Sequence, residues 1–105
     1  MVIIETPIFT KLITSLMSDD EYKVLQETLV NRPDMGAILK NSGGLRKVRW
    51  ALEGRGKSGG VRIIYYWMNE NDQIYMIYAF TKKAQENLTD AQLKTLRAVV
   101  ERWSQ

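Results

Sequence analysis

Residues 61–68 read VRIIYYWM, an apolar and β-branched run that a single arginine interrupts. Strands with hydrophobic side chains at consecutive positions are usually covered on both faces of a sheet. The run therefore predicts a central strand, and Arg62 is its most informative residue. A cation at such a position is costly unless an anion or a polar cleft meets it.

Other strands are predicted on both sides of this run. Residues 1–5 are apolar and β-branched, residues 45–52 alternate between polar and apolar side chains, and residues 73–80 continue the sheet after a turn at 69–72. Residues 34–44 contain three glycines and are expected to be irregular.

Three helices are predicted from their start signals. Thr6 followed by Pro7 begins the first, whose apolar residues recur at helical spacing up to Met17. Residues 18–21 and 89–92 are capping boxes that begin the other two. The order β-α-α-β-β-β-α predicts a small α+β domain with a mainly antiparallel sheet, a helical hairpin on one face and a C-terminal helix. All the helices are expected on that one face.

The composition limits the chemistry of the chain. Its 105 residues suit one domain, and they include no cysteine and no histidine. Disulfides and thiol chemistry are thereby excluded, and the commonest metal ligand and the usual general base near neutral pH are missing. No metal and no cofactor are predicted. With no apolar run of membrane-spanning length and no signal peptide, a cytoplasmic protein is predicted.

Positive charge is concentrated in the middle of the chain. Residues 40–62 contain seven basic residues and one acid, a sum of +6, whereas the rest carries eight basic residues and eleven acids, a sum of −3. A basic block of this kind indicates a surface that binds a polyanion.

The loop EGRGKSGG at residues 53–60 resembles the end of a nucleotide-binding P-loop. The P-loop pattern requires a glycine where Ala51 stands, and a helix rather than a strand must follow it. The loop is therefore predicted to be a hairpin tip, and Arg55 and Lys57 are expected to contact a polyanion.

The alternation of side chains along a strand predicts where the cations point. Lys47 and Arg49 share one face, and Arg46 shares the other with the core residues Val48 and Trp50. Arg62 is expected beside Lys47 and Arg49, on the side away from the helices. The alternative is that Arg62 pairs with Glu53 or Glu70.

A cationic cleft with aromatic walls suits RNA, since phosphates meet Lys and Arg while bases stack on rings. The aromatic candidates for the walls are Trp50, Tyr65, Tyr66, Trp67 and Tyr78. Such a cleft can also cleave RNA without histidine. A lysine among other cations loses its proton more easily and can act as a base, and Lys47, beside Arg46, Arg49 and Arg62, fits that description.

Three stretches resemble the HigB branch of the RelE superfamily: GGLRKVRWA at 43–51, GRGKSGGVRIIYYW at 54–67 and IYAFTKKAQENLT at 77–89. These proteins are toxins of type II toxin–antitoxin pairs, and they cleave mRNA in the ribosomal A site. The resemblance implies that the catalytic positions are Lys47, Arg49, Arg62 and Lys83. The candidate RNA contacts are Arg46, Arg55, Lys57 and Lys82. A tyrosine that assists catalysis in RelE-like members has no counterpart at residues 86–89.

The resemblance also implies partners. We expect a HigA-like antitoxin with a helix-turn-helix, the ribosome and mRNA, operator DNA only through the antitoxin, and no membrane. Because one fold can carry several functions, two alternatives stay open: a toxin that poisons DNA gyrase without cutting nucleic acid, and a noncatalytic RNA-binding module.

Overall fold

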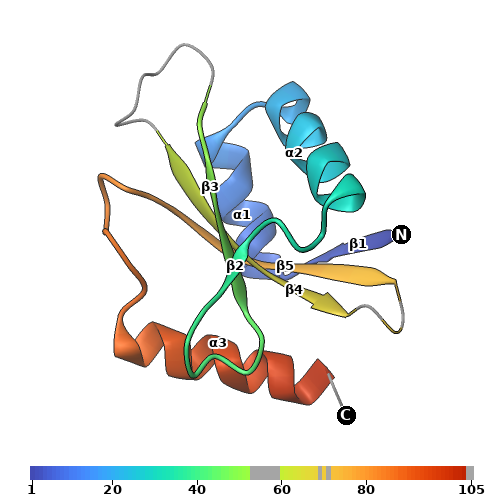
Figure 1. The fold of residues 1–105 in the computed structure, drawn as a ribbon. Coiled ribbons are helices and arrows are strands. Elements are labelled where there is room, and N and C mark those ends of the chain that lie inside the picture. The colour runs from blue at the N-terminus through green and yellow to red at the C-terminus, as the bar shows by residue number, and fades with distance from the viewer. Residues whose placement is uncertain (53–59, 69, 71, 104–105) are drawn as a thin grey trace.

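The computed structural model describes residues 1–52, 60–68, 70 and 72–103. The chain forms a five-stranded sheet in the order β1-β5-β4-β3-β2 (Figure 1). The pair β1–β5 is parallel, and the other pairs are antiparallel. In chain order the elements are β1 (Val2–Glu5), α1 (Pro7–Leu16), α2 (Asp19–Asn31), β2 (Ala37–Ile38), β3 (Arg46–Trp50), β4 (Val61–Met68), β5 (Gln73–Thr81) and α3 (Asp90–Trp103).

The run VRIIYYWM is the centre of the sheet, as predicted. It forms β4, which pairs with β3 on one side and β5 on the other, and residues 61–65 are all buried. Ile63 and Ile64 point to opposite faces, and each belongs to a different hydrophobic cluster. A strand that is apolar on both sides therefore requires cover on both faces of the sheet.

The predicted helix starts are confirmed. The side chain of Thr6 accepts a hydrogen bond from the Phe9 amide. Ser18 and Glu21 form a reciprocal capping box, with the two amide–oxygen distances at 2.9 and 3.2 Å. Thr89 and Gln92 do the same at the start of α3, at 3.0 and 3.1 Å. In the described part of the chain, no helix has both the length and the apolar character needed to cross a membrane.

The expectation that all helices lie on one face is wrong. The helices α1 and α2 contribute Phe9 and Leu25 to a cluster with Ile63, whereas α3 contributes Leu96 to a cluster with Ile64 on the opposite face. In Figure 1, α3 accordingly lies across the lower part of the sheet, apart from α1 and α2. The cause is the doubly apolar central strand, because one helical layer covers only one of its faces.

A short strand within residues 34–44 was not predicted. Ala37 pairs with Lys47, and Ile38 pairs with Arg46, so β2 forms one edge of the sheet. Two residues are too few to show the alternation of apolar and polar side chains that identifies a strand in a sequence. The strand predicted at 45–52 is also shorter, since pairing spans Arg46–Trp50.

Two tyrosines are expected to make the fold sensitive to alkaline pH. Burial raises the pKa of Tyr65 above its ordinary value of 10.0. Burial and the hydrogen bond from its hydroxyl to Glu5, at 2.6 Å, also raise the pKa of Tyr22 above that ordinary value. Above pH 10 the unfolded chain then binds fewer protons than the folded chain, so the free energy of unfolding falls as pH rises.

Urea unfolding between about pH 9 and pH 11.5 measures this slope, which is at most about 1.4 kcal/mol per pH unit for each tyrosine. Tyr22→Phe and Tyr65→Phe should each give a shallower slope. Ser15→Ala, which changes no titrating group, should keep the wild-type slope. Equal slopes in all four proteins would show that neither tyrosine resists ionisation in the fold.

Candidate nucleic-acid interface

Three of the four cations of β3 and β4 lie together on one face of the sheet. Arg49 is paired directly with Arg62, and Lys47 is paired with Ile64, which belongs to the cluster under α3. Paired residues of antiparallel strands point to the same side, so the predicted grouping of Lys47, Arg49 and Arg62 is confirmed. This face lies opposite α1 and α2, but it also carries α3, which covers another part of it.

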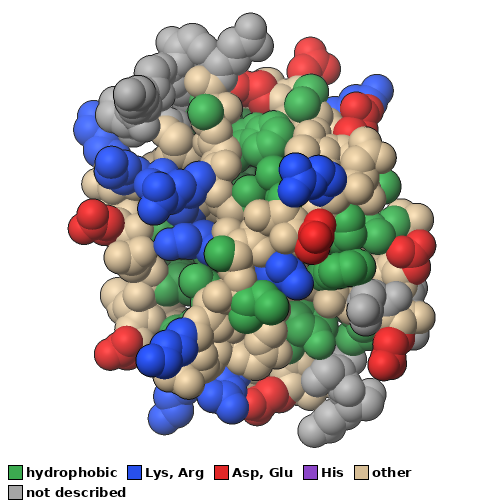
Figure 2. Space-filling model, in the orientation of Figure 1, with side chains coloured by type: hydrophobic (Ala, Val, Ile, Leu, Met, Phe, Trp, Pro, Cys, Tyr) green, Lys and Arg blue, Asp and Glu red, His purple; other side chains and the backbone are tan. Residues whose placement is uncertain are grey.

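Lys82 and Lys83 follow β5 at the same end of the sheet. The Lys82 amide donates to the carbonyl of Gly60, at 3.4 Å, and Thr81 is paired with Val61 at the start of β4. Both lysines are exposed. Figure 2 shows Lys and Arg side chains gathered over this end of β3 and the segment after β5. We call the set of Lys47, Arg49, Arg62, Lys82 and Lys83 the cationic face.

Arg62 is buried although it carries a charge. Its side chain is 7% exposed, and its buried Nε has no hydrogen-bond partner among residues 1–52, 60–68, 70 and 72–103. Pairing with Glu70, one of the expected alternatives, is not observed, because Glu70 lies beyond the opposite end of β4. Glu53 lies outside the described residues. A buried donor without an acceptor costs free energy that an arriving anion can offset.

Lys47 has a partner that the sequence did not suggest. Its Nζ donates to Oδ1 of Asn87, at 3.2 Å, across 40 positions of the chain. Asn87 lies in the stretch where the resemblance implied a tyrosine, and no periodicity or motif marks it. The contact joins β3 to the segment of residues 82–89, which also carries Lys83.

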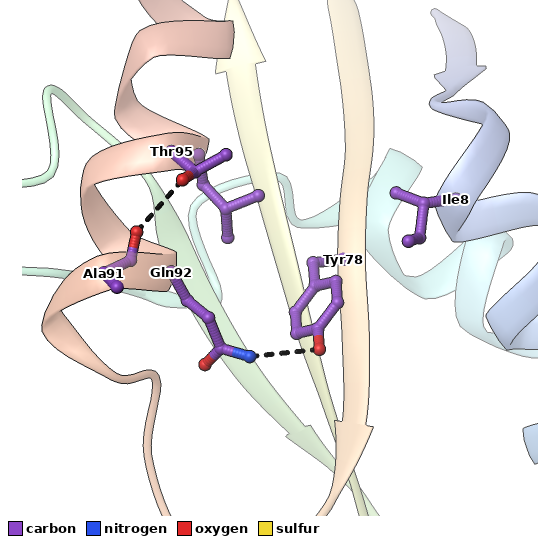
Figure 3. Close-up of a pocket in the computed structure, with 6 residues that line it drawn as sticks. Ile8, Tyr78, Ala91, Gln92 and Thr95 are labelled. Carbon is purple, nitrogen blue, oxygen red and sulfur yellow. Dashed lines mark hydrogen bonds between the residues drawn. The ribbon is translucent and has the colours of Figure 1, made fainter.

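An amide network holds that segment against α3. Nε2 of Gln85 donates to Oε1 of Gln92 and to the carbonyl of Asn87, both at 2.8 Å. Nε2 of Gln92 in turn donates to the hydroxyl of Tyr78, at 3.2 Å (Figure 3). The first turn of α3 thus fixes the backbone that presents Asn87 to Lys47.

Arg46 is separated from the cationic face. Its Nη1 donates to the carbonyls of Asp34 and Gly36, at 3.2 and 2.8 Å. Its guanidinium carbon lies 5.7 Å from the centroid of the Trp67 ring, which packs on the cluster under α1 and α2. The prediction that Arg46 shares the face of Val48 and Trp50 is confirmed, so Arg46 does not belong to the group of cations around Lys47. Arg46 fixes the segment before β2, and its assignment as an RNA contact stays a prediction.

Residues 4–105 match the sequence model of a family described as the RelE toxin of the RelE/RelB toxin–antitoxin system. The chain belongs to the RelE toxin family. The solved structure of an Escherichia coli RelE mutant in the free state, which carries two Arg-to-Ala substitutions, is similar to it with a TM-score of 0.59. The two chains are 16% identical, and the match covers 92% of this chain and 93% of that one. This likeness confirms the RelE-like α+β fold, and family membership implies an antitoxin as partner.

The remaining residues that were predicted to contact RNA in this RelE-family chain are not among those that make up the cationic face. Arg55 and Lys57 lie outside the described residues. Tyr65, one of the rings considered as a wall, is fully buried in the core under α1 and α2. Within the described ranges, no cluster of three or more Asp, Glu, His or Cys side chains is placed to hold a metal ion.

A hollow of the RelE-family fold outside the cationic face has a different chemical character from that face. It opens between α1 and α3 over β5, with a volume of about 320 Å³ (Figure 3). No Lys, Arg, Asp or Glu is among its described lining residues, which are Ile8, Tyr78, Ala91, Gln92, Thr95 and Leu96. This lining does not suit a polyanion, so the cationic face remains the candidate interface for nucleic acid.

Proposed function

We propose that this RelE-family toxin is an endoribonuclease that cleaves mRNA in the ribosomal A site and thereby stops translation. One observation carries the proposal: the buried Arg62, whose Nε has no partner in the described part of the chain, lies directly opposite Arg49 on the cationic face. Toxins of this family are ribonucleases. A pair of guanidiniums, one buried and one exposed, is suited to holding a phosphate whose charge increases during cleavage.

In the proposed reaction, the 2′-hydroxyl of a nucleotide attacks the adjacent phosphorus. The bond from phosphorus to the 2′-oxygen forms as the bond to the 5′-oxygen breaks, which leaves a cyclic phosphate and a free 5′-hydroxyl. One protein group takes the proton of the attacking hydroxyl, and another gives a proton to the leaving oxygen. No metal ion takes part in this scheme.

The cationic face supplies a group for each task. Arg62 and Arg49 stabilise the phosphate, because guanidiniums stay charged and donate in pairs. Lys47 and Lys83 are the groups that can carry protons. The contact with Asn87 keeps Nζ of Lys47 at a defined position on the face.

We further propose that the toxin is of the HigB type. The support is the resemblance of residues 43–66, which include β3, most of β4 and the residues between these strands. Its antitoxin is then HigA-like with a helix-turn-helix, operator DNA is contacted only through that antitoxin, and the toxin acts on ribosomes in the cytoplasm.

Cell-free translation with primer extension on the message tests the proposal. The wild-type chain should stop synthesis and produce cuts within the reading frame only when ribosomes are present. Arg49→Ala and Lys83→Ala should each slow cleavage about tenfold, because each removes one charged contact to the phosphate. Lys23→Ala, which removes an exposed lysine from α2, should cleave at the wild-type rate.

Two results would contradict parts of this proposal. Full activity of both Arg49→Ala and Lys83→Ala would place the site elsewhere. Arrest of growth with a DNA-damage response and no cut message would instead support the gyrase-poisoning alternative.

A further inference from the structure

A second hollow adjoins the cationic face. It has a volume of about 220 Å³ and lies where the segments before β3 and after β5 meet the first turn of α3. Its lining residues are Leu39, Lys40, Lys47, Asn87, Leu88 and Leu93.

The lining combines three kinds of group that an RNA base and its phosphate require. Leucines supply apolar surface for the face of a base. The carboxamide of Asn87 offers both donors and an acceptor, and such amides read the edges of bases. Lys40 and Lys47 add two ammonium groups to the lining, which suit the attached phosphates. The hollow between α1 and α3 has no charged residue in its described lining and lacks this combination.

The hollow is continuous with the proposed cleavage site through Lys47. This residue lines the hollow and also belongs to the cationic face. Arg49 lies two residues further along the same side of β3, a displacement of about 7 Å. An RNA strand that is held at Arg49 and Arg62 and runs along β3 passes Lys47, with a neighbouring base within reach of the hollow.

We propose that this hollow is a subsite for one unstacked base of the RNA substrate, and that Asn87 contacts the edge of that base. The inference rests on the proposed function, since it concerns the substrate of the same site. It gives Asn87 a role in base recognition besides its contact with Lys47. Cleavage should then depend on the presence and identity of one particular base near the cut.

Ribosomes loaded with short synthetic messages provide the test. In three messages, one A-site nucleotide at a time lacks its base, and the single-turnover rate of cleavage is measured against the complete message. For the wild-type toxin, we expect one of the three messages to be cleaved roughly tenfold more slowly, the size of effect typical of losing one stacked or paired base.

Two variants test whether the hollow causes the dependence of the cleavage rate on that base. Asn87→Ala removes the amide, and Leu93→Phe fills the apolar part without touching the amide. Both should cleave the complete message and the base-free message at nearly equal rates. Asn31→Ala, at the end of α2, removes a matched amide and should keep the wild-type difference. Thermal unfolding verifies that each variant is folded.

The outcomes distinguish this inference from the function on which it rests. A tenfold difference that disappears in Asn87→Ala and Leu93→Phe supports the subsite. If the wild type cleaves all four messages equally, or both variants retain the difference, the subsite is overturned while the ribonuclease function stands. If the wild type cleaves none of the messages, both proposals fail.

Discussion

Arg62→Met is expected to lower the rate of message cleavage by about 10²–10³-fold without destabilising the fold. Arg62 is the buried member of the cationic face, and it lies opposite Arg49. Removing a preorganised donor from a water-poor site costs more than removing an exposed one, because the low local polarity strengthens its interaction with the phosphate.

The same substitution should leave the free energy of unfolding unchanged or raise it by about 1 kcal/mol. A buried guanidinium whose Nε lacks a partner in the described structure is unfavourable, and an unbranched apolar side chain of similar length removes that cost. Loss of activity and gain of stability at one position indicate a residue kept for function.

Urea unfolding and single-turnover cleavage on ribosomes measure the two effects. Arg32→Met, at the exposed end of α2, serves as the matched control and should change neither quantity appreciably. A strongly destabilised Arg62→Met would show that the guanidinium is satisfied in the fold, and full cleavage activity would remove Arg62 from the site.

Tyr65→Ala is expected to lower the free energy of unfolding by about 3–5 kcal/mol. The ring is fully buried in the cluster under α1 and α2. Its hydroxyl donates to the carbonyl of Pro33, at 2.8 Å, and accepts from the amide of Gly36, at 2.9 Å. The substitution therefore leaves a cavity and two unsatisfied backbone groups.

Tyr65→Phe separates the two contributions. It keeps the ring and removes the hydroxyl, so a loss of about 1–3 kcal/mol is expected. Both variants should also loosen residues 33–36, which hydrogen exchange of the Gly36 amide reports. Tyr66→Phe, on the neighbouring position of β4, is the control and should stay within about 0.5 kcal/mol of the wild type. A loss as small as this in Tyr65→Phe would mean that the two hydrogen bonds contribute little.

Local signals in the sequence predicted most of the elements. The Thr6 cap and the capping boxes at 18–21 and 89–92 are hydrogen bonds between residues at most three positions apart. The identities of neighbouring residues therefore suffice to predict them. The strand β4 was predicted with its observed bounds because its composition differs sharply from the charged turn that follows. The grouping of Lys47, Arg49 and Arg62 followed from alternation along two adjacent strands.

The errors concern relations between distant segments. The side of the sheet that α3 covers depends on which apolar face the other helices leave open, and no local pattern records that choice. No local pattern indicates the partners of Arg46, which are carbonyls 10 and 12 residues away, and its assignment as an RNA contact stays a prediction. No pattern in the sequence marked Asn87 as a site residue, because its partner Lys47 lies 40 residues away along the chain.

The sequence by itself determined the fold class, the order of every element except β2, and a concentration of positive charge in residues 40–62, because capping, alternation and composition are short-range properties of a chain. Only the tertiary structure decided which of those charges act together. The direction of a side chain follows from its strand, but its partners and its burial depend on packing between segments far apart. That packing buries Arg62 in the sheet, holds Arg46 against the carbonyls of Asp34 and Gly36, and brings Asn87 to Lys47.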